Sequence, residues 1–130
     1  MAQVLVVDAD PAMAGIIEFH LRRGGHRVVV VRTGPDALAA VAANHPKPDL
    51  AVLDVAMPGM TGFELLEALR GVEGLTDLGA VFLSGRSRPK DFEMGRHLGA
   101  AYLTKPLAAS DLLAAVERIL DRTGSAPARS

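Results

Sequence analysis

Five short apolar runs, separated by stretches with helical spacing, set the pattern of this chain. The runs are Val4–Val7, Arg27–Val31, Leu50–Leu53, Ala80–Leu83 and Ala101–Thr104. The run Leu50–Leu53 shows no alternation of apolar and polar residues, as is typical of a strand covered on both faces in a parallel sheet. Strand and helical patterns alternate five times, which indicates βαβ units. The pattern therefore predicts an α/β fold with a five-stranded parallel sheet.

Capping and breaking residues mark the ends of the predicted helices. Asp10 has a carboxylate suited to an N-cap, and Pro11 after it suits the first position of a helix. At a later helix start, Thr61 and Glu64 have the spacing of a capping box. Glycines and prolines predict the other boundaries: Gly24-Gly25, Gly34-Pro35, Pro46, Pro48, Gly71, Pro89 and Gly99. The local signals thus place a helix after each strand.

The last helix and the residues after it predict the extent of the domain. The helix has the clearest 3.6-residue pattern of the chain, formed by Leu112, Leu113, Val116, Ile119 and Leu120. From Arg122 onward the residues are Thr, Gly, Ser, Ala, Pro and Arg, with nothing apolar enough to pack. We expect one domain over residues 1–121 and a disordered tail, or the start of a linker, over residues 122–130.

Composition excludes several classes of function. The net charge of −1 argues against nucleic acid binding by this segment alone, and the absence of cysteine excludes disulfides and thiolate metal sites. The first apolar run is too short for a signal peptide or a membrane span. With no tryptophan and 4% aromatic residues, the chain lacks the stacking surfaces usual for flavin or haem. We expect a soluble, cytoplasmic protein.

Four reactive side chains follow four of the apolar runs: Asp8, Asp54, Ser84 and Lys105. The carboxyl ends of parallel strands meet at one edge of the sheet, where ligands of such sheets bind. Two adjacent carboxylates repel each other unless a cation lies between them, and oxygen ligands suit Mg²⁺. A carboxylate can also attack phosphorus and form an aspartyl phosphate. The residues allow this chemistry at Asp54, with Lys105 as a fixed cation and Ser84 as a hydrogen-bond donor.

With these residues in this order, the chain resembles the response-regulator receiver domains, the family of the chemotaxis protein CheY, over residues 2 to about 121. The matching features are Asp8, Asp54 with Met57-Pro58-Gly59 and Gly62, Ser84 before Gly85, and Lys105-Pro106 preceded by Tyr102. Each feature alone is weak evidence for the family, but all of them in this order are specific to it. The resemblance implies a flavodoxin-like, doubly wound (βα)5 fold with strand order 2-1-3-4-5.

The resemblance also implies a function in a two-component system. Asp54 would accept phosphate from a sensor histidine kinase or a phosphotransfer protein, and Asp8, Asp54 and the backbone carbonyl of Ala56 would hold Mg²⁺. Ser84 and Tyr102 would form a switch that controls the face built from the fourth helix, the fifth strand and the fifth helix. That face would act on an effector domain or protein, with a homodimer as a further option. No enzyme activity is expected beyond slow self-dephosphorylation.

One residue departs from the family pattern. Two adjacent acids usually follow the first strand, but here Asp8 is followed by Ala9, with Asp10 one place later. Asp10 is a further candidate metal ligand, although its side chain is also the predicted N-cap. We therefore expect weak Mg²⁺ binding and slow phosphorylation. Two alternatives stay open: a phosphorylation-independent pseudo-receiver that acts as an interaction module, and a purely structural role for Tyr102.

Overall fold

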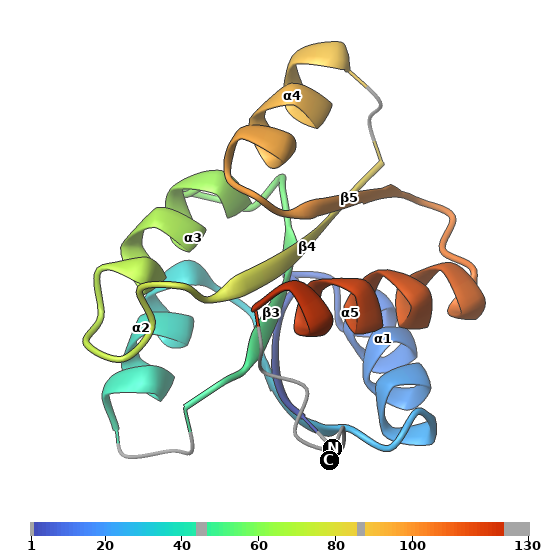
Figure 1. Cartoon of the computed structure of the whole chain (residues 1–130), viewed down its shortest axis with the longest axis horizontal. Helices are drawn as coiled ribbons and strands as arrows, with labels where there is room; N and C mark the ends of the chain where they lie inside the picture. Colours follow the sequence, from blue (N-terminus) through green and yellow to red (C-terminus); the bar gives the residue numbers. More distant parts are fainter. Residues whose placement is uncertain (1, 44–46, 86–87, 124–130) are drawn as a thin grey trace.

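A computed structural model describes residues 2–43, 47–85 and 88–123, and these ranges form five strands and five helices in alternation (Figure 1). The strands are β1 Gln3–Val7, β2 Arg27–Val31, β3 Leu50–Asp54, β4 Gly79–Ser84 and β5 Ala101–Thr104. The helices are α1 Pro11–Arg23, α2 Gly34–Ala42, α3 Gly62–Arg70, α4 Pro89–His97 and α5 Ala109–Thr123. Each predicted apolar run lies in a strand.

The strands form one parallel sheet in the order β2-β1-β3-β4-β5, which confirms the predicted flavodoxin-like topology. Figure 1 shows α1 and α5 on one face of this sheet and α2, α3 and α4 on the other. Register pairs Val7 with Leu53, and Ser84 with Thr104. The carboxyl ends of these strands therefore line up at one edge.

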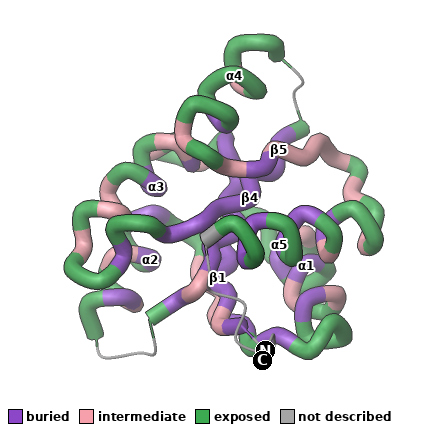
Figure 2. Tube along the Cα trace, in the orientation of Figure 1, coloured by how far each residue is buried: buried purple, intermediate pink, exposed green. Residues whose placement is uncertain are grey.

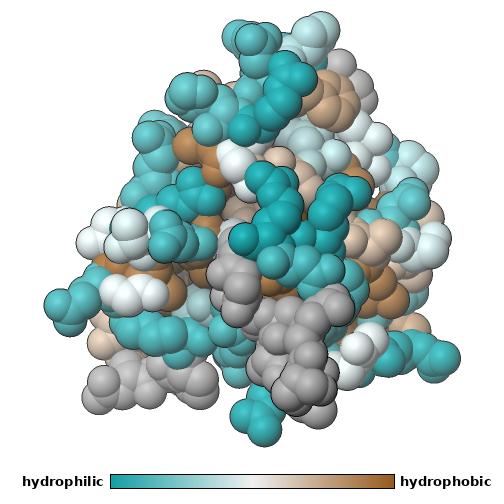
Figure 3. All heavy atoms as spheres, viewed as in Figure 1, coloured by the Kyte–Doolittle hydropathy of each residue, from teal (hydrophilic) through white to brown (hydrophobic). Residues whose placement is uncertain are grey.

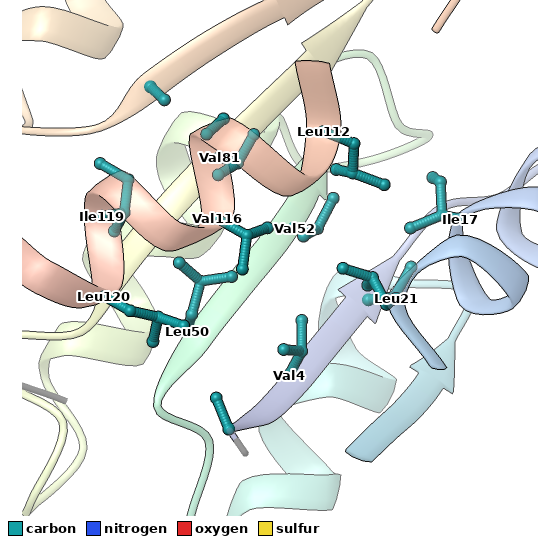
Figure 4. Packing of buried hydrophobic residues seen from close by; sticks show 14 of the residues in the cluster. Val4, Ile17, Leu21, Leu50, Val52, Val81, Leu112, Val116, Ile119 and Leu120 are labelled. Carbon is teal, nitrogen blue, oxygen red and sulfur yellow. The ribbon is translucent and has the colours of Figure 1, made fainter. Parts of the chain in front are cut away.

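Two hydrophobic clusters, one on each face, explain why the strands lack an apolar–polar alternation. Successive side chains of a strand point to opposite faces. Val4 and Val6 accordingly pack in the cluster under α1 and α5, which Figure 4 shows, while Leu5 and Val7 pack in the cluster under α2 and α3. The tube in Figure 2 is buried along the central strands. Burial on both sides requires apolar residues at every strand position.

The predicted capping groups form the bonds expected of them. The Ala12 N–H donates to Asp10 Oδ1 at 3.0 Å. At α3, the Glu64 N–H donates to Thr61 Oγ1 at 3.1 Å, and the Thr61 N–H donates to Glu64 Oε1 at 2.9 Å. Both caps satisfy amides that the first turn of a helix leaves without intrahelical partners.

Helix α5 runs to Thr123, just past residue 121, where the sequence predicts the domain to end, and that boundary stays a prediction. Residues 124–130 and Pro46 lie outside the described residues, so the tail stays a prediction. Helix α4 ends at His97, before Gly99. None of the helices in the described ranges combines the length and apolarity that crossing a bilayer requires.

The start of α3 packs directly against the backbone at the end of β3. A Cβ atom on Gly62 would lie 2.5 Å from the Asp54 carbonyl oxygen and 3.2 Å from Val55 Cα. The Gly62 N–H also donates to the Val55 carbonyl at 2.9 Å. Because the neighbouring atoms belong to the backbone, they cannot rotate away. Only glycine allows this approach.

Replacing Gly62 with alanine should lower the free energy of unfolding by about 1–3 kcal/mol, since the added methyl group displaces the end of β3. Gly15→Ala is the matched control, because a Cβ at Gly15 in α1 meets nothing within 4 Å. This control should be more stable than the native chain by up to about 1 kcal/mol. Urea denaturation measures both changes, and equal stability of the two variants would contradict the proposed close contact.

Candidate functional site

Three charged side chains meet at the carboxyl edge of the sheet. Asp8 follows β1, Asp54 is the last residue of β3, and Lys105 follows β5. Lys105 Nζ lies 3.6 Å from Asp8 Oδ2 and 3.7 Å from Asp54 Oδ1. Strand order explains the meeting, since β1 and β3 are neighbours and β5 lies two strands further along the sheet. The ammonium group lies within reach of both carboxylates.

Asp8 is almost completely buried, with 1% of its surface exposed. Its Oδ1 accepts the Asp10 N–H at 2.9 Å. Its Oδ2 accepts no hydrogen bond from the described residues and is shielded from solvent. A buried carboxylate oxygen without a donor is costly unless a cation compensates it. The Lys105 charge provides part of that compensation, and a metal ion at this point would add to it.

Asp54 ends its strand with 9% of its surface exposed, and its Oδ1 accepts the Ala56 N–H at 3.4 Å. Burial raises the pKa of the Asp54 carboxyl above its ordinary value, and the Asp8 charge raises it further. The Lys105 charge and the Ala56 N–H act in the opposite direction. Desolvation and like charge dominate this balance. The ionised form of Asp54 is therefore held at a cost.

The acidic residues near β1 differ in their surroundings. Ala9 and Asp10 are both exposed, and the Asp10 carboxylate caps α1. No group of three metal-binding side chains occurs among the described residues. The oxygens of Asp8 and Asp54 still fit Mg²⁺ in chemical type, and the solvent-shielded Asp8 Oδ2 is the atom that a cation would satisfy. The position of Ala9 contributes nothing to such a site.

Ser84 and Tyr102 connect this edge to α4. Ser84 ends β4 with 4% exposure, and its carbonyl accepts the Lys105 N–H at 2.8 Å. Tyr102 is half-buried, and its ring lies 4.5 Å from the Phe92 ring between centroids. A Cβ on Gly95 would lie 3.3 Å from the Tyr102 ring. The side chain of Tyr102 thus packs directly under α4.

Sequence reasoning did not single out Phe92. It is 40% exposed in a polar helix, so no periodic apolar pattern marks it. Its position on α4, three residues before Gly95, places it against Tyr102 only because β5 and α4 are packed together. The packing partner of Tyr102 is therefore a result of the tertiary structure.

Asp54→Asn should be more stable than the native chain at pH 7. Because the pKa of Asp54 is raised in the folded protein, its stabilising contribution is complete below the unfolded value of 3.8 and is lost as the pH rises through the folded pKa. Asparagine cannot ionise, so the advantage of the variant should grow over that window and stay constant above it. Urea midpoints between pH 4 and 7 measure it. Asp111→Asn, at an exposed position, serves as the control. A native chain more stable than Asp54→Asn at pH 7 would contradict this sign.

Comparison with known sequences gives a consistent result. The family model described as the response regulator receiver domain matches residues 4–117. The chain is 35% identical over 127 residues to the DNA-binding response regulator MtrA of Mycolicibacterium smegmatis, covering 97% of this chain and 54% of that protein. It is 37% identical over 124 residues to the transcriptional regulatory protein PrrA of Mycobacterium tuberculosis, covering 95% and 52%. The chain spans about half the length of these curated relatives.

Solved structures agree with the sequence comparison. The chemotaxis protein CheY4 of Vibrio cholerae superposes with a TM-score of 0.83 at 30% identity, covering 92% of this chain and 99% of that one. A CheY-like receiver domain protein from Methanospirillum hungatei gives a TM-score of 0.82 at 27% identity, covering 95% and 97%. The order of the strands agrees with these matches. The chain belongs to the response regulator receiver domain family of two-component systems.

Proposed function

We propose that this chain is a cytoplasmic phosphoacceptor domain in which Asp54 receives a phosphoryl group from a sensor histidine kinase or a phosphotransfer protein. The observation that carries the proposal is the position of Lys105 Nζ, 3.7 Å from Asp54 Oδ1 at the end of a buried strand. A nucleophilic carboxylate beside a fixed cation is what phosphoryl transfer requires. Family membership supports the same assignment.

The chemistry follows from the residues at this edge. An Asp54 oxygen forms a bond to phosphorus while the bond from phosphorus to the donor histidine breaks, and the imidazole nitrogen retains the electron pair. Lys105 neutralises charge on the phosphoryl oxygens, and the Ser84 hydroxyl and nearby backbone amides donate hydrogen bonds to them. Asp8, Asp54 and the Ala56 carbonyl would hold Mg²⁺, with Asp10 available only if it leaves the helix cap. When bound, the metal supplies further positive charge.

The proposed output is a change in the face formed by α4, β5 and α5. Phosphorylation would shift the equilibrium between two pre-existing conformations as Ser84 and Tyr102 rearrange. A change from 1:99 to 99:1 requires ~5.5 kcal/mol of differential stabilisation. Figure 2 shows most of α4 as exposed, so few packing contacts hold this helix in place. This supports α4 as the helix that moves in the proposed switch. A weakly held metal would give only part of that shift.

The partner of this face would be an effector domain or protein, or a second copy of the chain. The relatives MtrA and PrrA are named as DNA-binding and transcriptional regulators. We propose that this domain likewise controls an output of that kind without itself contacting nucleic acid. Figure 3 shows hydrophilic side chains over much of the surface facing the viewer, with small hydrophobic patches between them. A charged, reversible contact fits such a surface better than a permanent apolar one.

A second candidate function is a pseudo-receiver that binds partners without phosphorylation. Ala9 favours it, because the position beside Asp8 supplies no carboxylate. The arrangement of Asp54, Lys105 and Ser84 favours the phosphoacceptor, because an interaction module gains nothing from a buried pair of carboxylates. The two functions differ in whether Asp54 reacts.

Incubation with acetyl phosphate and Mg²⁺ should add a phosphoryl group of about 80 Da to the native chain, as measured by intact-protein mass. Asp54→Asn should show no adduct, because the nucleophilic oxygen is gone. The Ala9→Asp variant should give a larger yield. An adduct that persists in Asp54→Asn would rule out this acceptor. No adduct on the native chain, with recovery in Ala9→Asp, would establish the pseudo-receiver.

Ala9→Asp should also bind Mg²⁺ about tenfold or more tightly than the native chain, because it adds a carboxylate oxygen next to Asp8. Titration followed through the backbone amide resonance of Ala56 measures this affinity without any phosphoryl donor. Ala12→Asp is the matched control, since it adds the same charge at an exposed position of α1. If both variants tighten binding equally, the gain comes from net charge and the assignment of position 9 to the metal site fails.

A further inference from the structure

Helix α4 is attached to the rest of the domain unevenly. Of its residues, only Gly95 is buried, and it lies in the second half of the helix. At the start, Arg88 makes no side-chain cap bond among the described residues. Figure 1 shows the helix projecting from the body with its first turn furthest from the sheet. In the first half, the Phe92 ring contacts the Tyr102 ring, and Arg88 forms an ion pair with Asp91 of the same turn at 3.7 Å.

The end of α4 continues through backbone hydrogen bonds into the turn before β5. The Leu98 N–H donates to the Met94 carbonyl at 3.0 Å, and the Ala100 N–H donates to the Gly95 carbonyl at 2.9 Å. Gly99 between them has a φ of +70°, which closes the turn into β5. These bonds leave the Leu98 carbonyl free to accept from another element.

Arg70, the last residue of α3, makes that connection. Its Nη1 donates to the Leu98 carbonyl at 2.8 Å, while Nε and Nη2 donate to the Leu78 carbonyl at 3.0 and 2.8 Å. Leu78 directly precedes β4. One planar guanidinium therefore joins the ends of α3 and α4 to the beginning of β4.

The environment of Arg70 favours a fixed rather than a solvated side chain. The residue is half-buried, and burial lowers the pKa of its guanidinium, an effect that the charge of Asp77 opposes. Arginine nevertheless stays charged at neutral pH. Bonds from a charged donor to carbonyl oxygens are stronger than those between neutral groups. Three such bonds from one side chain resist separation of the elements that they join.

We propose that Arg70 is the positioning residue that fixes the C-terminal end of α4 as a pivot, so that the switch at Ser84 and Tyr102 moves the first half of this helix. Ser84 ends β4, whereas Leu78 precedes the start of the same strand. The clamp and the switch therefore act at opposite ends of β4. This inference rests on the proposed function, because it assigns a mechanical role within the same switch.

The test is amide hydrogen exchange of the unphosphorylated full chain, with and without Arg70→Met. In the native protein, the amides of Leu98 and Ala100 should exchange more slowly than that of Asp91 in the first turn, because opening starts at the weakly held end. In Arg70→Met, protection at Leu98 and Ala100 should fall about tenfold more than protection at the β4 amides. Unchanged protection there, or an equal loss in β4, would overturn the proposal.

Two further variants separate clamping from general stability. Arg70→Lys keeps the charge and the aliphatic stem but cannot bond both carbonyls with a planar fork, so it should also lose local protection. Arg22→Met is the matched control, because Arg22 also lies in the last turn of a helix and donates to a carbonyl, that of Val28 at 3.1 Å. It should leave the α4 amides unchanged. Full protection in Arg70→Lys, or equal loss in Arg22→Met, would overturn the clamp.

A second readout addresses the coupling itself. Tyr102 is the single tyrosine of the chain, so 3-fluorotyrosine labelling gives one ¹⁹F resonance under α4. With acetyl phosphate and Mg²⁺, Arg70→Met should form the Asp54 adduct within twofold of the native yield, yet show less than half of the native shift at this resonance. An equal shift would overturn the coupling role. Failure of the native chain to form an adduct would contradict the proposed function. The hydrogen-exchange comparison would then still decide whether Arg70 holds the end of α4.

Discussion

The ion contact of Lys105 with Asp8 and Asp54 is the interaction on which the functional edge depends. Two buried carboxylates side by side repel each other, and removal from water adds a larger penalty. A single ammonium within 3.7 Å of both relieves part of that repulsion. Because the three residues lie at the carboxyl ends of β1, β3 and β5, the contact also requires the sheet to be assembled in the observed order. The charge arrangement and the topology therefore support each other.

Compensation of the buried negative charge at this edge is incomplete. Asp8 Oδ2 has no hydrogen-bond donor among the described residues, and the pKa of Asp54 is raised despite the nearby cation. A metal ion beside Asp8 Oδ2 would complete the charge balance and relieve this cost. The resemblance to the family implies a second acid at the position of Ala9, so a metal bound here would have fewer oxygen ligands.

The two ends of β4 have different physical roles in the proposed switch. At the carboxyl end, Ser84 lies beside the charged residues and is linked through the Lys105 amide to β5. At the other end, the Leu78 carbonyl is held by Arg70 together with that of Leu98. Helix α4 lies between a changeable contact and a fixed one. In the proposed switch, such an arrangement would convert a small change at Ser84 into movement of the first half of α4, whose surface is largely exposed.

The sequence by itself determined the sheet, the strand positions and the caps, because burial on both faces and unpaired helix amides impose local patterns. Such patterns are visible in the apolar runs Val4–Val7 and Leu50–Leu53 and in the capping box of Thr61 and Glu64. It also placed Asp8, Asp54, Ser84 and Lys105 at strand ends. Only the tertiary structure decided the contacts of Phe92 and Arg70 and the close approach at Gly62. These contacts join residues from separate helices and strands, and the spacing of residues along the chain does not predict distances between such elements.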